Sequence, residues 1–438
     1  MHVDALQYYL DSCYVLQHRE GRIYCAYLTD TDCTMAATKK QYYEYIVIGC
    51  GGIGSGALYW LSKRSNSALG LEQFSLGHER GGSQDVSRII RLTHHDDRYT
   101  KLVPDTFKAW EQIERESGLQ VVWMTGGLRL ARKGQTEARL EAYAVEMDRN
   151  NIRYDRLSNK QLMARYPQFT VGPDIVALYQ GQSGLVDAVM GNAVHIQLAR
   201  GNGATILENC PATRLTRANN GNVIVHTTKG VFECRKVVVT SGGWLNSVLG
   251  TIGVHVPVTV TQEQVTYYAT PHMKEFTEKT FPIWIFHCPQ YDFYALPIHG
   301  NTGTKIGIDV GGKAVTADTR TFEPDPDQER ICTELLQEIC PKFLGPILQT
   351  KTCLYTMPPD RDFLVDTCAY KGWSDVIVCC GAGHAYKFAS LLGKILSELA
   401  VDGRTQYDIS QFNITRDAIQ DPTFKPTFSL WSSVEAKL

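Results

Sequence analysis

Three stretches of the sequence predict an α/β protein with a second, β-rich domain. Residues 45–48 and 68–71 are short apolar runs of strand type, and the apolar residues between them follow a helical spacing. The stretch 255–310 is rich in β-branched and aromatic residues, which is typical of an antiparallel sheet. Residues 376–378 lead through a glycine turn into a helix with an apolar face over 388–399. Between these we expect a strand at 127–130, a charged helix at 134–150 and a buried strand at 237–239.

Composition and charge narrow the classes of function. Of the 438 residues, 43% are hydrophobic and 21% charged, which argues against disorder and coiled coil. The 44 basic and 46 acidic residues leave a net charge of -2, so bulk charge does not attract nucleic acid. No apolar run reaches the ~18 residues that a membrane span needs. The 13 cysteines are scattered, follow no secretory signal and lack zinc spacing, which predicts reduced thiols inside the cell and no metal site.

A glycine-rich motif lies at the first turn from strand to helix. Residues 49–54 read Gly-Cys-Gly-Gly-Ile-Gly and match G-x-G-x-x-G. Gly49 allows a tight turn, Gly51 lets the backbone approach a pyrophosphate, and Gly54 lets the helix pack closely on the strand. Glu72 follows 18 residues after Gly54, near the ~20 expected for a carboxylate that accepts ribose hydroxyls. The pattern predicts a Rossmann-type dinucleotide site that also includes Gly52 and Ile53, and it does not separate FAD from NAD.

The segment after the second strand narrows that choice. Residues 80–83 read Arg-Gly-Gly-Ser, and residues 87–91 read Ser-Arg-Ile-Ile-Arg. Two arginines separated by two apolar residues also suit a solvated helix face. In this order, however, the features resemble the flavin amine-oxidase family of monomeric sarcosine oxidase, pipecolate oxidase, N-methyltryptophan oxidase and fructosyl amino acid oxidase. The resemblance implies FAD, with Arg88 at its isoalloxazine ring and Arg91 on the carboxylate of the substrate.

A second block of the resemblance covers 352–366. Its Cys-Leu-Tyr-Thr-Met-Pro-Pro-Asp run looks like the C-x-Y-T-x-x-P-D segment of the family, in which the cysteine forms a thioether to the 8α carbon of FAD. The resemblance therefore implies covalent attachment through Cys353, and a buried structural thiol is the alternative. We assign further cofactor contacts to Ser83, Ile90, Gly242 and Trp244.

A third block lies at 294–309 and resembles the substrate sheet of the family. By that resemblance Tyr294 lines the substrate cavity and Lys305 activates oxygen, because an ammonium stabilises the superoxide that forms. The alternative is that Lys305 is an ordinary solvent-exposed lysine on a strand. Asp309 stands where sarcosine-oxidising relatives carry histidine and fructosyl amino acid oxidases carry an acid, which would suit a cationic or polyhydroxylated substrate. The implied catalytic residues are Arg88, Tyr294, Lys305 and Asp309.

The last block, at 381–388, resembles the G-H-G-F-K segment of the family. It implies that the backbone of Gly383, His384 and Ala385 faces the pyrimidine end of the flavin. Lys387 would also contact the cofactor and, with Arg91, bind the substrate carboxylate. The alternative is that Lys387 lies in the first turn of a helix and has no interaction partner.

This chain departs from the family at a few positions. Gln84 and Asp85 replace a His-Gly pair, so the contact of a flavin-stacking histidine is lost. Ala385 replaces a glycine, and the turn before His384 is one residue shorter.

The segments predict a discontinuous FAD domain and a substrate domain of antiparallel sheet and helices. The FAD domain comprises 43–124, 185–256 and 350–410, and the substrate domain comprises 125–184 and 257–349. Residues 1–42 are an N-terminal extension, disordered or forming an extra strand, and 411–438 are a C-terminal tail.

The resemblance implies an oxidase that converts a secondary amine in an N-substituted amino acid to an imine and reduces O2 to H2O2. Sarcosine, pipecolate, saccharopine and glycated amino acids are candidate substrates. A dehydrogenase that passes electrons to a quinone or carrier protein, and an inactive flavoprotein, are alternatives. A nicotinamide dehydrogenase is a third, which the context of Cys353 disfavours.

The final tripeptide, Ala-Lys-Leu at 436–438, is similar to the S-K-L peroxisomal address. In a eukaryote it predicts binding to the peroxisomal import receptor, where catalase would remove the peroxide. Otherwise we expect a cytoplasmic protein.

Overall fold

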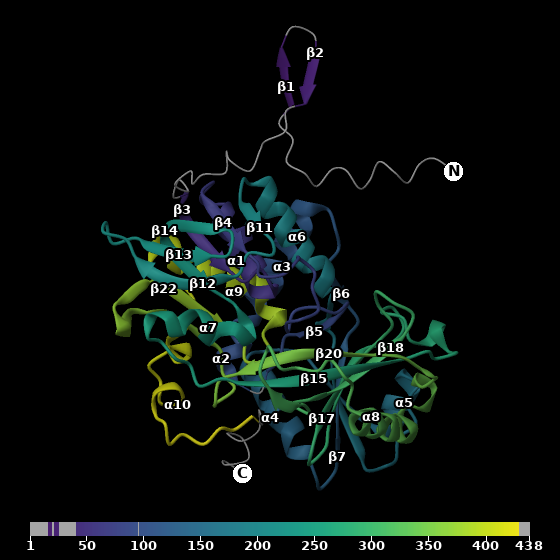
Figure 1. Cartoon of the computed structure of the whole chain (residues 1–438). Coiled ribbons are helices and arrows are strands. Elements are labelled where there is room, and N and C mark those ends of the chain that lie inside the picture. Colours follow the sequence, from purple (N-terminus) through teal and green to yellow (C-terminus); the bar gives the residue numbers. More distant parts are fainter. Residues whose placement is uncertain (1–15, 20–21, 26–40, 95, 429–438) are drawn as a thin grey trace. The chain divides into compact units, whose positions relative to one another are not determined.

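A computed structural model describes residues 16–19, 22–25, 41–94 and 96–428. The chain divides into two units, residues 1–41 and 42–438. In the first unit, β1 (Leu16–Arg19) pairs antiparallel with β2 (Arg22–Cys25) in a separate two-stranded sheet (Figure 1). The disorder predicted for the rest of this extension, and the tripeptide at 436–438, lie outside the described residues.

The second unit contains an eight-stranded sheet built from distant segments. Its strand order is β11-β4-β3-β14-β13-β12, with β22 beside β14 and β21 beside β22. The strands are β3 (Gln41–Ile48), β4 (Ala68–Leu71), β11 (Thr205–Leu207), β12 (Ala212–Arg217), β13 (Val223–Thr227), β14 (Gly230–Val239), β21 (Leu364–Cys368) and β22 (Trp373–Cys380). Because β3 runs parallel to β4 and β14 runs parallel to β22, the Rossmann-type prediction is confirmed.

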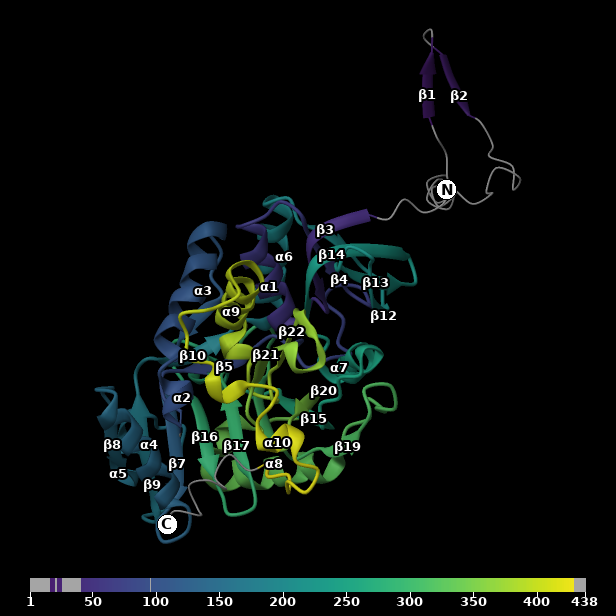
Figure 2. The same ribbon diagram turned by 90° about the vertical axis from the view of Figure 1, so that its left-hand side faces the viewer.

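A group of helices covers one face of this sheet (Figure 2). They are α1 (Gly52–Ser62), α3 (Val103–Ser117), α6 (Ala188–Gly201) and α9 (Ala389–Asp402). A Cβ on Gly393 of α9 would lie 2.3 Å from the carbonyl carbon of Gly56 in α1, so glycines let these two helices pack closely. The helices bury one apolar cluster against the sheet, and α7 (Leu245–Leu249) with the chain after it covers a second cluster on the other face.

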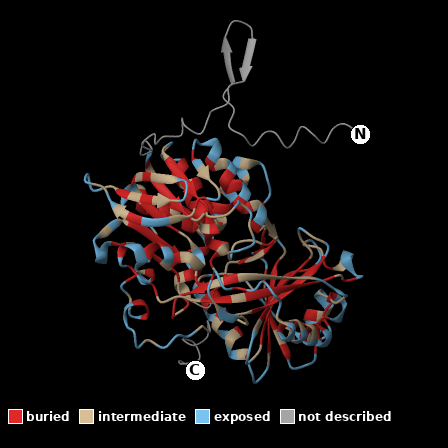
Figure 3. Ribbon diagram, in the orientation of Figure 1, coloured by how far each residue is buried: buried red, intermediate tan, exposed pale blue. Residues whose placement is uncertain are grey.

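The antiparallel pairing predicted for 255–310 is also confirmed, within a nine-stranded sheet in which β16 and β7 pair parallel. The strand order is β19-β15-β18-β17-β16-β7-β9-β8, with β20 beside β15. The strands are β7 (Gly127–Arg132), β8 (Asp155–Ser158), β9 (Ile175–Gln180), β15 (Thr259–Tyr268), β16 (Ile283–His287), β17 (Asp292–Leu296), β18 (Thr304–Asp309), β19 (Lys313–Val315) and β20 (Ile347–Met357). Its helices are α4 (Glu137–Arg149), α5 (Asn159–Arg165) and α8 (Pro326–Ile339). Figure 3 shows buried residues concentrated along the strands of both sheets.

A small three-stranded sheet contains the predicted arginine segment. It consists of β5 (Arg88–Arg91), β10 (Ser183–Val186) and β6 (Val122–Met124). The segment is therefore a strand and not a solvated helix face. The short helices α2 (Asp97–Thr100) and α10 (Asp417–Gln420) complete the unit. Within the described residues, none of the helices is long and apolar enough to span a membrane.

Two predicted boundaries differ from the structure. Because β20 pairs along its whole length with β15, residues 350–357 belong to the substrate sheet and not to the FAD domain. Residues 411–428 are not a loose tail: Phe412 and Ile419 are buried, and Arg416 Nε donates to Asp360 Oδ2 over 2.7 Å.

Candidate functional site

One cavity of about 360 Å³ brings the predicted site residues together, within the usual size of small-molecule sites. Its lining comes from the glycine turn, the chain before and within β5, and strands β17, β18 and β20. The predicted residues that line it are Gly49, Gly51, Gly52, Ile53, Glu72, Ser83, Arg88, Arg91, Gly242, Trp244, Tyr294, Lys305, Asp309, Cys353, Gly383, His384, Ala385 and Lys387.

Two predicted cofactor residues do not line the cavity. Ile90 is fully buried in the helix-side core, because neighbouring residues on a strand point to opposite faces, and Ile89 faces the cavity in its place. Ile90 is therefore a packing residue, and its predicted cofactor contact is wrong. Gly54 lies behind the turn, where an added Cβ would approach the Gly49 carbonyl oxygen to 1.8 Å. That is the close strand–helix packing expected of the third glycine.

The glycine turn leaves room for a phosphate group at the start of α1. An added Cβ on Gly51 would lie 2.8 Å from Ser83 Oγ, which itself accepts a hydrogen bond from the Gly52 amide over 2.8 Å. The helix has no side-chain cap and no acidic residue in its first turn. The N-terminus of an uncapped helix attracts anions, so this geometry fits the pyrophosphate of a dinucleotide.

Glu72 lies at the end of β4, where the ribose acceptor was predicted. Its Oε2 accepts a hydrogen bond from the Cys50 amide (2.9 Å), and its Oε1 accepts one from the Phe74 amide (3.0 Å). Burial raises the pKa of this carboxyl, but the hydrogen bonds from His78, Phe74 and Cys50 outweigh burial and lower it. The carboxylate is therefore an ionised acceptor in the cavity wall.

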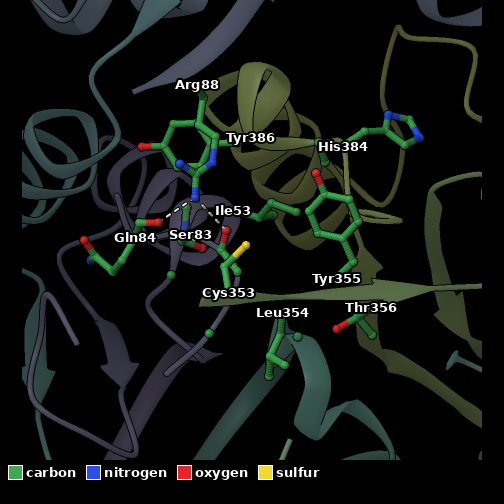
Figure 4. A pocket seen from close by; sticks show the side chains of 18 of the residues that line it. Ile53, Ser83, Gln84, Arg88, Cys353, Leu354, Tyr355, Thr356, His384 and Tyr386 are labelled. Carbon is green, nitrogen blue, oxygen red and sulfur yellow. Dashed lines mark hydrogen bonds between the residues drawn. The ribbon is translucent and has the colours of Figure 1, made fainter. Parts of the chain in front are cut away.

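Cys353 lies on β20 and faces the cavity. Figure 4 shows Cys353 and Tyr355 on one side of the strand and Leu354 and Thr356 on the other, as strand alternation requires. Burial raises the pKa of the Cys353 thiol to about 11, although Arg88 acts in the opposite direction. Without a further charge beside it, the thiol is protonated at neutral pH.

Lys305 is buried in an ion pair that the sequence did not predict. Its Nζ pairs with the carboxylate of Asp85 and donates to the Ser87 carbonyl over 2.7 Å. Asp85 also accepts a hydrogen bond from the Tyr267 hydroxyl (2.6 Å). Burial lowers the pKa of Lys305 to about 8 against the pull of Asp85, and Lys305 with Arg88 holds the pKa of Asp85 at about 2. Lys305 is only 2% exposed, so the solvated-lysine alternative is wrong.

Arg88 lies beside this pair. Its Nη2 donates to the Gln84 carbonyl (2.5 Å) and its Nη1 to the Ser87 carbonyl (2.9 Å). The guanidinium lies 5.8 Å from the ring centre of Tyr386. Figure 4 shows the two side chains. Backbone carbonyls thus fix the position of this cation at the cavity wall.

Asp309 is not an isolated anion. Its Oδ1 accepts a hydrogen bond from Arg361 Nη2 over 2.7 Å, and the Arg361 side chain is 2% exposed. This pairing offsets the negative charge on which the expected preference for a cationic or polyhydroxylated substrate depends.

Arg91 and Lys387 both reach the cavity, as the carboxylate clamp requires. Lys387 Nζ donates to the His384 carbonyl (2.5 Å), and Arg91 Nε donates to the Thr93 carbonyl (3.1 Å). Burial, then Arg91, depresses the pKa of Lys387 well below its usual value. Neither cation forms an ion pair with an acidic side chain of the described residues.

The turn at 381–385 presents backbone to the cavity. Gly383 has φ +77°, and an added Cβ there would lie 2.6 Å from the Tyr355 ring, so the position needs glycine. The His384 ring turns away in Figure 4, stacks on Phe363 with ring centres 4.9 Å apart, and contacts the Arg361 carbonyl.

The sequence missed several lining residues. In the sequence, Asp85 stood out only as a departure from the family. A charged residue where relatives have glycine is the signal that could have marked it as a site residue. Arg129 and Tyr143 had no signal, because they lie outside the matched motifs, and Tyr386 lies within the matched block 381–388 but was given no role.

The chain is similar to known proteins over most of its length. The sequence profile described as FAD dependent oxidoreductase matches residues 44–399. Monomeric sarcosine oxidase of Streptomyces avermitilis is 31% identical over 381 residues, which cover 85% of this chain and 97% of that protein. Human peroxisomal sarcosine oxidase is 28% identical, with coverage of 87% and 97%. The structure of NikD, an unusual amino acid oxidase essential for nikkomycin biosynthesis, superposes with a TM-score of 0.77 at 25% identity, covering 85% and 98%.

Proposed function

The chain belongs to the FAD dependent oxidoreductase family, and from that premise we propose that it oxidises the secondary amine of an N-substituted amino acid to an imine, with O2 reduced to H2O2. The observation that carries the proposal is the pair of cations, Arg91 and Lys387, in the cavity that also contains the glycine turn. Two such cations suit one carboxylate of an amino acid. The relatives named sarcosine oxidase act on a substrate of this kind.

The residues present fit FAD. The turn at 49–54 and the N-terminus of α1 would bind its pyrophosphate and Glu72 its ribose, while Ser83, Gly242 and Trp244 would line the remainder. When bound, the flavin supplies the acceptor of the hydride equivalent and returns the electrons to O2. We also propose that Cys353 holds it covalently.

The protein contributes orientation and electrostatics. Arg91 and Lys387 bind the carboxylate and so fix the substrate, whose amine must be neutral before it gives up a hydride equivalent. A carboxylate between these cations also offsets the repulsion that lowers the pKa of Lys387. Lys305, held by Asp85 and the Ser87 carbonyl, places an ammonium where negative charge develops on oxygen.

One observation favours a second candidate, a dehydrogenase that passes electrons to a carrier. The carboxylate of Asp85 offsets the positive charge of Lys305, and that charge is the basis for the reaction with O2. The rate of reoxidation by air distinguishes the two.

The test is anaerobic reduction of the bound flavin, followed by its visible absorbance. The panel contains sarcosine, L-pipecolate, L-proline, saccharopine and fructosyl-glycine. We expect one compound to bleach the flavin, and colour and peroxide to return on admission of air. If a compound bleaches the flavin but air restores colour only slowly, the dehydrogenase is correct. If no compound bleaches it, the proposed reaction is wrong.

Attachment through Cys353 is tested by denaturation. We expect acid-precipitated protein to keep its flavin and Cys353→Ser to release it. Release from the unchanged protein would refute the thioether.

For a eukaryotic source, we also propose peroxisomal import through the tripeptide at 436–438. The peroxisomal human relative supports it. A fluorescent protein fused to the N-terminus should colocalise with catalase only when these three residues are present.

A further inference from the structure

A buried arginine in the cavity has no role in the site so far. Arg129 lies on β7, whose neighbouring residues Leu128 and Leu130 point into the core of the substrate domain. Its side chain therefore points to the opposite face, where it lines the cavity. The guanidinium carbon lies 3.3 Å from the ring centre of Tyr143 on α4, and the residue is 7% exposed.

The end of this guanidinium is unsatisfied. Neither terminal nitrogen of Arg129 has a hydrogen-bond partner among the described residues. Burial of a charge without such a partner costs free energy. We therefore expect a bound ligand to supply the missing hydrogen-bond acceptors. Burial lowers the pKa of Arg129 to about 9, and the group is still charged at neutral pH.

The acidic groups near Arg129 already have other partners. Asp292 accepts a hydrogen bond from Arg139 (3.0 Å) and contacts His287 Nδ1 (2.9 Å). Asp309 pairs with Arg361. Arg91 and Lys387 add positive charge to the same cavity and lack acidic partners among the described residues. The local balance is therefore an excess of positive charge from Arg91, Arg129 and Lys387, to which Arg88 adds because it shares the carboxylate of Asp85 with Lys305.

The single carboxylate of a simple amino acid would neutralise only part of this positive charge. In the proposed function Arg91 and Lys387 bind that carboxylate, which leaves the two Arg129 nitrogens for a second anionic group. The planar pair of terminal nitrogens matches the two oxygens of a carboxylate.

We propose that Arg129 forms a second carboxylate subsite, so that the substrate is an N-substituted dicarboxylic amino acid. The inference rests on the proposed function for the identity of the reacting amine. The subsite itself stands on the unsatisfied guanidinium and the charge balance of the cavity. Sarcosine would leave Arg129 unpaired and is expected to be a poor substrate.

Binding to the flavin-loaded protein tests the subsite without turnover. In calorimetric titrations we expect glutarate to bind at least about tenfold more tightly than glutaramate, its mono-amide analogue, which keeps only one carboxylate. Arg129→Leu should weaken glutarate binding about 10- to 100-fold and change acetate binding by less than about twofold. Arg129→Gln provides a second variant if leucine prevents folding.

Arg132→Leu is the matched control. Arg132 lies on the same strand but pairs with Asp174 and Glu338 outside the cavity, so glutarate binding should not change. If Arg129→Leu leaves glutarate binding unchanged, or weakens acetate and glutarate equally, the second-carboxylate subsite is wrong.

Oxidation of paired substrates then tests the substrate class. We expect kcat/KM for N-methyl-L-glutamate to exceed that for N-methyl-L-glutamine at least about tenfold, and Arg129→Leu to remove the difference. Equal values in the unchanged protein would overturn the substrate class. Failure of both amines to reduce the flavin contradicts the proposed reaction, and the glutarate titration still decides the subsite.

Discussion

Asp85 shows how a single residue changes the electrostatics of the cavity. Its φ of +122° is a backbone conformation that side chains rarely adopt, which costs about 1–3 kcal/mol. The ion pair with Lys305 and the hydrogen bond from Tyr267 offset that cost. A strained carboxylate against a buried lysine therefore sets the charge state of Lys305.

The reaction with O2 should depend on the protonation of Lys305. Because its pKa is about 8, the ammonium is present below that pH and is lost as the pH rises through it. We expect flavin reoxidation to slow above about pH 8, while flavin reduction accelerates as the substrate amine loses its proton. Lys305→Met should slow reoxidation about 100-fold or more and abolish its pH dependence. Stopped-flow measurement of the two half-reactions checks this, and unchanged reoxidation in the variant would contradict it.

Removal of the Asp85 charge should shift that pH dependence. Asp85 raises the pKa of Lys305, so without it the pKa falls further and the ammonium is lost at lower pH. Both Asp85→Asn and Asp85→Gly should move the midpoint of reoxidation below that of the unchanged protein. Only Asp85→Gly also relieves the backbone strain and should have the higher Tm of the two variants. The same midpoint in all three proteins would refute this role.

At the scale of elements, glycines determine how α1 meets its neighbours. Gly54 packs against the turn at Gly49, and Gly56 packs against α9. Both contacts occur in the helix whose N-terminus faces the cavity. The strength of cofactor binding is thus coupled to helix packing.

Substitution of Gly54 should therefore destabilise the protein and weaken FAD binding. In Gly54→Ala the added Cβ would meet the Gly49 carbonyl, and overpacking of this kind costs about 1–3 kcal/mol. Gly201, at the exposed end of α6, has open space around it and is the matched control. Gly201→Ala should stabilise the fold by about 0.5 kcal/mol through the unfolded state. Thermal unfolding and flavin content measure both effects, and equal Tm values would contradict the packing argument.

At the scale of the whole molecule, the C-terminal segment 411–428 packs against the chain near the cavity. Arg416 pairs with Asp360, and the Phe428 carbonyl accepts a hydrogen bond from Arg361 over 3.0 Å. Arg361 in turn pairs with Asp309 in the cavity wall. Asp360, the last residue of the motif that begins at Cys353, connects to this segment and does not line the cavity.

The Arg416–Asp360 pair should hold this segment in place. Both side chains are largely buried, so removal of one partner leaves the other charge unpaired. We expect each single variant, Arg416→Ala or Asp360→Ala, to lower the free energy of unfolding, and the double variant to lower it by less than the sum of the two single effects, with a coupling of about 0.5–3 kcal/mol. Denaturant unfolding of both single variants and the double variant measures it. Additive effects would show that the pair contributes no stability of its own.

Much of the fold and the cofactor end of the site was predictable, because those signals are local. The βαβ opening, the strand-rich stretch 255–310 and the glycine motif each show their pattern within a few dozen residues. The domain boundary at 350 was wrong, since strand pairing across the sheet assigns β20 to β15 and composition does not. Ile90 was wrongly assigned to the cofactor. Strand alternation directs its side chain into the core, and this became visible only once the partners of β5 were known.

The sequence by itself determined the fold class, the glycine turn and the cations that converge on one cavity. Only the tertiary structure decided which of those charges are compensated. Lys305 pairs with Asp85, Asp309 pairs with Arg361, and Arg129 has no acidic partner among the described residues. The physical reason is that a motif depends on neighbours along the chain, whereas the charge state of a buried group depends on side chains brought to it from other strands.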